Sequence, residues 1–172
     1  SCVGINDVDA SQHVVSQLAD GGRKRIALIN HDLSYKYSRL RERGYKSVIH
    51  LRDLDYQALE YASELSSSAG MAAMQNLLKA NPPDAVFAVS DTLAAGALRA
   101  IQQAGLRVPE DIAVVGFDGT ELAEMISLTT IEQPSRDIGR KAVNLLLNKI
   151  DNPDAPTERV MMDWRFISRA SS

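Results

Sequence analysis

Two acidic side chains follow directly after apolar runs in this sequence, and both have the chemistry of a binding group. Asp118 follows the run 112–117 and precedes Gly119, while Asp91 follows Ser90 at the end of the run 84–89. An ionised carboxylate at the end of a buried strand is costly to bury unless it meets a partner. Asp118 is therefore expected either to cap the next helix or to be held ready for a ligand.

Both motifs also have purely structural interpretations. Serine and aspartate are favoured helix N-caps that stabilise a helix by about 1 kcal/mol, so Ser90-Asp91-Thr92 is equally well explained as a helix start. Taken alone, Asp118 is better explained as a cap or turn residue. A binding site is favoured because both acids are expected at one edge of one sheet. Helix N-termini there offer free N–H groups to the oxygens of a ligand.

The remaining reactive residues do not form catalytic or metal-binding patterns. His13, His31 and His50 are not spaced as metal ligands, and Cys2 is the only cysteine, which excludes an internal disulfide. The sequence contains no GxSxG, no GxxxxGK[ST] and no GxGxxG. We therefore expect no enzyme, no metal and no cofactor.

Size and composition are those of a globular protein with one domain, or one domain and an appendage. The 172 residues are 45% hydrophobic and 24% charged, with a net charge of −3. That charge argues against a chain that binds nucleic acid by itself. No apolar run approaches the roughly 18 residues that span a bilayer, and no signal peptide is visible. A cytoplasmic location is the simplest interpretation, although a mature exported protein would look similar.

Short apolar segments alternate with helical patterns along the chain. This alternation predicts an α/β fold with a mostly parallel open sheet and helices on both faces. Strands are expected at 25–30, 59–62, 84–89, 112–117, 128–132 and 160–167, and helices at 9–20, 35–48, 68–80, 91–104, 121–125 and 135–150. Ligands of such sheets bind beyond the carboxyl ends of the strands. The polar residues there are Asn30, Ser90, Asp91 and Asp118.

Five segments carry a family resemblance in their order and spacing. They are GRKRIA at 22–27, RLRERGY at 39–45, PDAVFAVSDTLAAGA at 83–97, GLRVPEDIAVVGFD at 105–118 and LTTIEQP at 128–134. Together they resemble the effector-binding core of the LacI/GalR family of bacterial transcription regulators. The resemblance implies a lobe of the type I periplasmic-binding-protein-like fold.

The resemblance also implies how the chain is divided. Residues 1–128 are expected to form the C-terminal lobe, 129–156 the crossover and a helix of the N-terminal lobe, and 157–172 the strands that return. The resemblance further implies that the DNA-reading helix-turn-helix and most of the first lobe lie outside these residues. The helix at 135–150 would then expose an apolar face, so we expect it to be displaced or packed against another molecule.

The same resemblance assigns an effector site. It places Arg41 and Asp118 at positions that bind effector hydroxyls, since a guanidinium donates two hydrogen bonds and a carboxylate accepts two. Ser90 should add a polar contact, with Asp91 behind it. Further effector contacts are expected at Tyr35 and Tyr37, which could supply a ring, and at Leu65, where relatives often carry an aromatic residue.

The family dimerises through this lobe, which implies a homodimer or a higher homo-oligomer. Our candidates for the interface are Met71, Met74, Leu78, Ala95, Met125 and Ile126, and ordinary core packing would explain about half of them.

The sequence thus predicts the ligand-sensing and dimerising part of a transcription regulator, most simply a repressor that responds to a sugar. Operator DNA would be bound only through the missing helix-turn-helix, and no membrane would be involved. The alternative is a periplasmic sugar-binding protein of a transporter, but VPEDIAVVGFD and LTTIEQP favour the regulator. An enzyme is a weaker third possibility.

Overall fold

Apolar strands form the centre of a six-stranded sheet. In the computed structural model, which describes residues 1–172, the strand order is β3-β2-β4-β5-β6-β8. The strands are β2 (Ile26–Asn30), β3 (Ala58–Tyr61), β4 (Ala85–Ala88), β5 (Ala113–Asp118), β6 (Thr129–Glu132) and β8 (Arg165–Ile167). Neighbours are parallel except β6 and β8. Strands β2 and β4 are buried throughout, as parallel strands covered on both faces must be.

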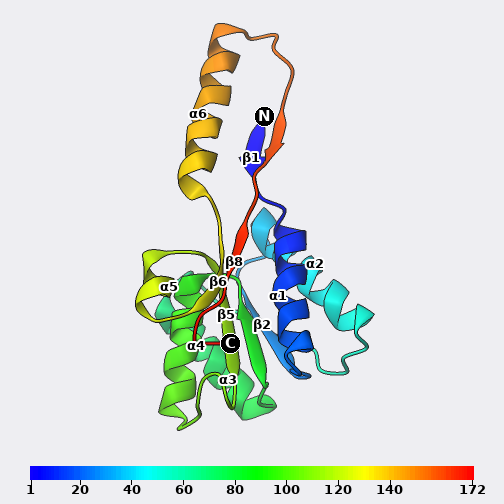
Figure 1. The fold of residues 1–172 in the computed structure, drawn as a ribbon, viewed down its shortest axis with the longest axis vertical. Coiled ribbons are helices and arrows are strands. Elements are labelled where there is room, and N and C mark those ends of the chain that lie inside the picture. Colours follow the sequence, from blue (N-terminus) through cyan, green and yellow to red (C-terminus); the bar gives the residue numbers. More distant parts are fainter.

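Helices cover both faces of this sheet and complete a layered body (Figure 1). One side carries α1 (Asp7–Asp20) and α2 (Lys36–Leu51), and the other carries α3 (Ser67–Ala80), α4 (Asp91–Gln103) and α5 (Glu121–Met125). Four of these helices begin with a side-chain cap, supplied by Asn6, Ser66, Ser90 and Thr120. Because the caps satisfy free N–H groups, each helix start is fixed next to a strand end.

Helices α3 and α4 pack backbone against backbone. A Cβ atom on Gly96 would lie 2.0 Å from the carbonyl oxygen of Ser67, and one on Gly70 would lie 2.3 Å from that of Leu93. Real Cβ atoms do not approach other atoms so closely. Glycine at these two positions is therefore a condition of the helix pairing.

An arm projects from one end of the body (Figure 1). It consists of α6 (Ser135–Asp151) and the parallel pair of β1 (Cys2–Gly4) and β7 (Arg159–Met161). Of the residues in α6, only Leu145 is buried. Four apolar side chains of this helix are each more than half exposed: Val143, Leu146, Leu147 and Ile150.

Strand pairing moves the boundaries expected from the sequence. Residues 129–132 were expected in the crossover, but they form β6 and pair with β5 in the body. The return segment at 157–172 is also divided, since β7 pairs with β1 in the arm and β8 with β6 in the body. A strand of three or four residues can join either sheet, and its own sequence does not determine which.

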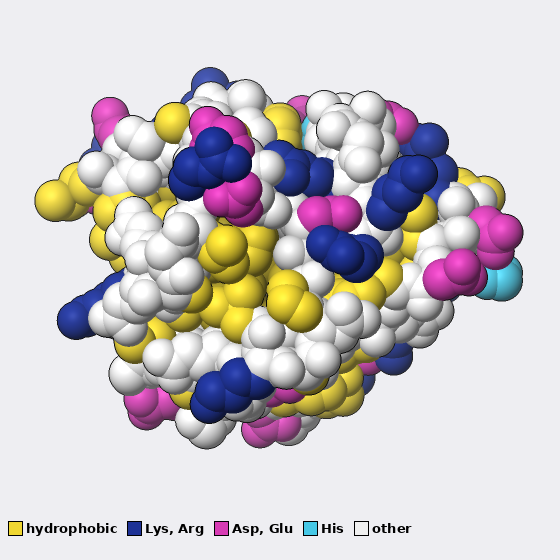
Figure 2. Space-filling view, turned by 90° about the horizontal axis from the view of Figure 1, so that it is seen from below, with side chains coloured by type: hydrophobic (Ala, Val, Ile, Leu, Met, Phe, Trp, Pro, Cys, Tyr) yellow, Lys and Arg dark blue, Asp and Glu magenta, His cyan; other side chains and the backbone are white.

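The other expected elements are present with small shifts at their ends. The helix expected at 9–20 begins at Asp7, and that expected at 135–150 ends at Asp151. None of the helices combines the length and the apolar character needed to cross a membrane. At the end of the body opposite the arm, basic and acidic side chains are interspersed around a hydrophobic patch (Figure 2).

Candidate functional site

Arg41 and Asp118 lie together at the carboxyl edge of the sheet. Asp118 is the last residue of β5, and Arg41 projects from α2, 77 residues away in the sequence. Arg41 Nη1 lies 3.5 Å from Asp118 Oδ1. The two side chains therefore meet at one edge of the sheet.

Arg41 is buried and held from three directions. Its Nε donates to Asp7 Oδ1 at 2.9 Å, and its Nη1 donates to the carbonyl oxygen of Val89 at 2.6 Å. The guanidinium carbon lies 3.5 Å from the centre of the Phe117 ring. Nη2 donates to no group of the protein, yet it is not sealed from solvent. One end of the planar guanidinium fork is thus without an acceptor in the protein.

Asp118 does not cap the following helix. Thr120 performs that function, since its hydroxyl accepts from the backbone N–H of Ala123. Gln133 Nε2 donates to Asp118 Oδ1 at 2.8 Å, and Oδ2 accepts no hydrogen bond from the protein. The residue also has φ 116°, a conformation that costs a non-glycine residue about 1–3 kcal/mol. Strain and an open acceptor at one residue are typical of a binding site.

Burial raises the pKa of Asp118 to about 6. The negative charge of Asp91 acts in the same direction, while Arg41 and the hydrogen bond from Gln133 oppose it. Burial makes the ionised form of Asp118 unfavourable in the absence of a ligand. Hydroxyl groups that donate hydrogen bonds to the carboxylate would stabilise that ionised form. The ionisation of Asp118 therefore links the site to pH.

This pKa predicts how stability and binding depend on pH. Between pH ~4 and ~6 the folded protein holds a proton on Asp118 that the unfolded chain has lost. The contribution of Asp118 to stability is thus present below that window and is lost as the pH rises through about 6. The melting temperature of the ligand-free protein, measured as wild type minus Asp118→Asn, should therefore be higher at pH 5 than at pH 7. A hydroxyl ligand should bind more weakly at pH 5, and a difference that does not change with pH would contradict the assignment.

An aromatic wall stands beside Arg41. The hydroxyl of Tyr37 lies 3.2 Å from His31 Nδ1, and the Arg41 guanidinium carbon lies 5.0 Å from the centre of the Tyr37 ring. The Tyr35 ring is 5.2 Å from that of His31, and its side chain is half exposed. The Tyr35 and Tyr37 rings also lie 5.6 Å apart, so both tyrosines and His31 form one cluster beside Arg41.

A buried network beneath this wall fixes α2 to the sheet. Glu42 accepts from Asn30 Nδ2 at 2.9 Å, from the Tyr61 hydroxyl at 3.0 Å and from Lys46 at 2.6 Å. Burial alone would raise the pKa of Glu42, but these hydrogen bonds outweigh it and leave the pKa below its ordinary value. The network thus holds the α2 backbone beside the sheet, at the residue that follows Arg41.

Asp91 is not available to an effector, which corrects the expectation from the sequence. It is fully buried and accepts from the Thr120 N–H and hydroxyl at 2.8 and 2.9 Å and from the Thr130 hydroxyl at 2.6 Å. A Cβ atom on Gly116 would lie 2.5 Å from its Oδ1. Asp91 therefore ties the strand ends together from behind the site.

Ser90 and Leu65 occupy different positions at this edge. Ser90 caps α4 by accepting from the Leu93 N–H at 3.2 Å, and its hydroxyl hydrogen is still free to donate. Leu65 lies exposed in the loop between β3 and α3. Effector contacts by Ser90 and Leu65 stay predictions.

Burial separates the six residues expected at an interface. Met74 is fully buried in the core and cannot contact a partner, so it is corrected to a core residue. Met71, Leu78 and Ile126 pack partly against the core, and Ala95 is also partly exposed. Met125 is 83% exposed. Ala95 and Ile126 line one cavity of about 480 Å³ with Leu98 and Val108.

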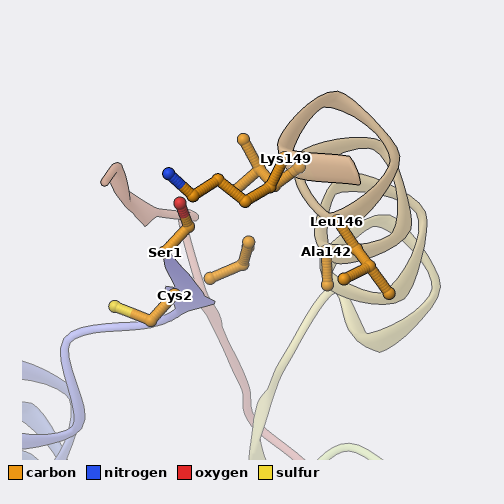
Figure 3. A pocket seen from close by; sticks show the side chains of 7 residues that line it. Ser1, Cys2, Ala142, Leu146 and Lys149 are labelled. Carbon is orange, nitrogen blue, oxygen red and sulfur yellow. The ribbon is translucent and has the colours of Figure 1, made fainter. Parts of the chain in front are cut away.

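A polar cavity of about 690 Å³ opens in front of Asp118. Its lining residues come from the ends of β5 and β6, the start of α6, the segment before β8 and the first residue of β8: Asp118–Thr120, Glu132–Asp137, Asp163 and Arg165. A second pocket, of about 170 Å³, lies in the arm between β1 and α6 and is mostly apolar (Figure 3). It contains neither Arg41 nor Asp118. No group of three or more His, Cys, Asp or Glu side chains is placed to hold a metal ion.

Three contacts of the site were not expected from the sequence. Asp7 and Gln133 hold Arg41 and Asp118, and Phe117 lies under the guanidinium. Asp7 is 34 residues from Arg41, so spacing along the chain carries no signal for the pair. Gln133 and Phe117 lie within the recognised segments, and their position beside strand ends was the available signal.

Comparison with known proteins matches most of the chain. Residues 15–172 match the family model of the periplasmic binding protein-like domain. The ribose operon repressor of Haemophilus influenzae is 35% identical over 160 residues, which cover 90% of this chain and 48% of that protein. The chain thus spans about half the length of the curated relatives it matches.

Solved structures share the fold closely. An uncharacterized protein from Actinobacillus succinogenes superposes with a TM-score of 0.97 at 49% identity, over 100% of this chain and 65% of that one. A LacI family transcriptional regulator from Enterococcus faecium, with bound ribose, gives a TM-score of 0.91 at 29% identity. That match covers 99% of this chain and 64% of the other.

Proposed function

This chain belongs to the periplasmic binding protein-like family, in the form carried by LacI-family transcription regulators, and on that premise we propose that it senses a sugar for a bacterial repressor. The observation that carries the proposal is the pair of Arg41 and Asp118. Arg41 keeps Nη2 unpaired and Asp118 keeps Oδ2 unpaired, on side chains fixed by all their other contacts. One free donor group beside one free acceptor suits the neighbouring hydroxyls of a sugar.

The contacts of the pair suggest how binding is transmitted. Asp7 lies where the chain enters the body from β1, and Gln133 lies where it leaves the body for α6. A ligand that pulls on Arg41 and Asp118 would therefore act on both crossings. In the whole protein this would couple sugar binding to the spacing of DNA-reading heads, through one element with two states.

The arm is proposed to be part of a second lobe. Its exposed side chains Val143, Leu146, Leu147 and Ile150 form an apolar surface that water does not favour. The half-length coverage of the curated relatives agrees with a further lobe that would cover this surface and close over the polar cavity.

A homodimer in the cytoplasm is part of the same proposal. Met125, Ile126 and Ala95 leave apolar atoms exposed around the 480 Å³ cavity. The alternative, a periplasmic binding protein of a transporter, is not favoured because the relative and the ribose-bound structure described above are transcription regulators. Gel filtration separates the two, since a regulator core should elute as a dimer.

The test is a thermal-shift screen of sugars on the whole protein, with ribose first. A sugar that raises the melting temperature of wild type should fail to raise that of Asp118→Asn, which keeps the shape of Asp118 and loses its charge. Glu121→Gln is the matched control, because this exposed residue of α5 loses the same charge only three positions away. A screen without any stabilising sugar, or a shift that survives Asp118→Asn, would overturn the proposal.

A further inference from the structure

The positive charge of Arg41 is already taken up by the protein. Two carboxylates contact one guanidinium: Asp7 at 2.9 Å and Asp118 at 3.5 Å. The three side chains together have a formal charge of −1. A ligand that reaches Arg41 Nη2 thus meets a hydrogen-bond donor with no surplus of positive charge.

The rim of the polar cavity does not restore that charge. Among its lining residues, Asp118, Glu132, Asp137 and Asp163 are acidic, whereas Arg136 and Arg165 are basic. Arg165 is further engaged by Glu132, with Nε donating at 2.7 Å. An anion entering this cavity would face more negative than positive groups, and the repulsion between like charges would oppose its binding.

We propose that Asp7 determines specificity: by taking up the charge of Arg41, it makes the site select uncharged, hydroxyl-rich ligands over their phosphorylated or carboxylated forms. The inference rests on the proposed sensing function and narrows the class of effector. Rejection of the wrong ligand by an unfavourable charge is a common route to specificity.

The position of Asp7 suits this role. It stands in the first turn of α1, where the helix N-terminus favours a negative charge. Its bond to Nε, with the Phe117 ring under the guanidinium, orients the fork so that Nη2 stays free. Asp7 thus neutralises the charge of Arg41 and sets the orientation of its guanidinium. It can do so without contacting the ligand itself.

The experiment compares matched neutral and anionic probes on the whole protein. The pairs are D-ribose with D-ribose 5-phosphate, D-galactose with D-galacturonate, and uridine with uridine monophosphate, each followed by thermal shift and calorimetry. In wild type, stabilisation should come from the neutral member of a pair. Asp7→Asn should change the affinity ratio in favour of the anionic member by roughly tenfold or more, since it leaves Arg41 with uncompensated charge.

Two variants control for folding and for general charge. Asp20→Asn removes the same charge from the other end of α1, where Asp20 pairs with Arg52 at 2.8 Å, and it should leave the ratio unchanged. Asp7→Glu keeps the charge and should keep the rejection of anions. If Asp7→Asn does not fold, the affinity of wild type for an anionic probe is measured at several salt concentrations. Its dependence on salt shows whether the site is negative or positive. Screening should improve the binding of an anionic probe to a negative site and weaken its binding to a positive one.

The outcomes separate this inference from the proposed function. Preferential stabilisation of wild type by an anionic probe, or an unchanged ratio in folded Asp7→Asn, overturns the role of Asp7 and leaves a ligand sensor in place. A panel that leaves wild type unstabilised overturns the proposed function and this inference with it.

Discussion

Replacing Arg41 with alanine is expected to abolish stabilisation by any effector of the whole protein and to lower the free energy of unfolding by about 3 kcal/mol. The variant removes the free Nη2 donor. It also leaves the Asp7 carboxylate and the Val89 carbonyl without their partner in a buried place. Thermal shift with and without ligand measures the first effect, and urea unfolding measures the second.

Arg43→Ala is the control for this variant. Arg43 lies on the same helix, is exposed and forms no ion pair, so its loss should change neither quantity by more than about 0.5 kcal/mol. Arg41→Lys should rescue little, because an ammonium cannot keep the bond to Asp7 while presenting a planar fork. Full ligand response in Arg41→Ala would show that the hollow beside Asp118 is not the effector site.

The second large effect is expected at the crossing of α3 and α4. Helix propensity alone predicts that Gly96→Ala stabilises α4 by about 1 kcal/mol. The crossing predicts the opposite sign, because the new Cβ would lie 2.0 Å from the Ser67 carbonyl and 2.6 Å from the Met71 nitrogen. Backbone atoms cannot rotate away, so the helices must separate and the free energy of unfolding should fall by about 3 kcal/mol.

Gly139→Ala provides the matched comparison in α6. A Cβ atom there meets nothing within 4 Å, so only helix propensity remains, and the variant should be more stable by about 0.5–1 kcal/mol. Urea midpoints of both variants test the pair. Equal and favourable effects at the two positions would mean that α3 and α4 are farther apart than the structure has them.

The sequence pattern was enough to predict the layers and the sheet edge at which Ser90, Asp91 and Asp118 lie. Alternation of apolar strands with helices predicts the sheet, and the position of Asp118 at a strand end predicts that its side chain faces outward. Arg41 was different, because α2 carries several basic residues and spacing alone cannot say which one turns inward. Only the family resemblance singled it out, and the contacts of Arg41 confirm that it lies beside Asp118.

Other features depend on residues far apart in the sequence. The Asp7 contact joins the start of α1 to α2, and neither segment carries a sign of the other. Met74 was expected at an interface because apolar residues on a helix face look alike, whether they contact a sheet or a partner. Its burial is decided by the rotation of α3 against the sheet, which the pattern on one helix does not fix.

The connections between arm and body have a mechanical consequence. The chain passes between the two parts three times, at Ile5-Asn6, at Gln133-Pro134 and at 162–164. Hydrogen bonds connect the third passage to the first and to α1. Met162 N donates to the Gly4 carbonyl, and Trp164 Nε1 donates to Asp9. Three short connecting segments that lie close together resist translation of the arm along the body but allow it to rotate, as a hinge does. A movement of a fraction of an ångström beside Arg41 and Asp118 would therefore be enlarged at the far tip of α6 in proportion to its leverage.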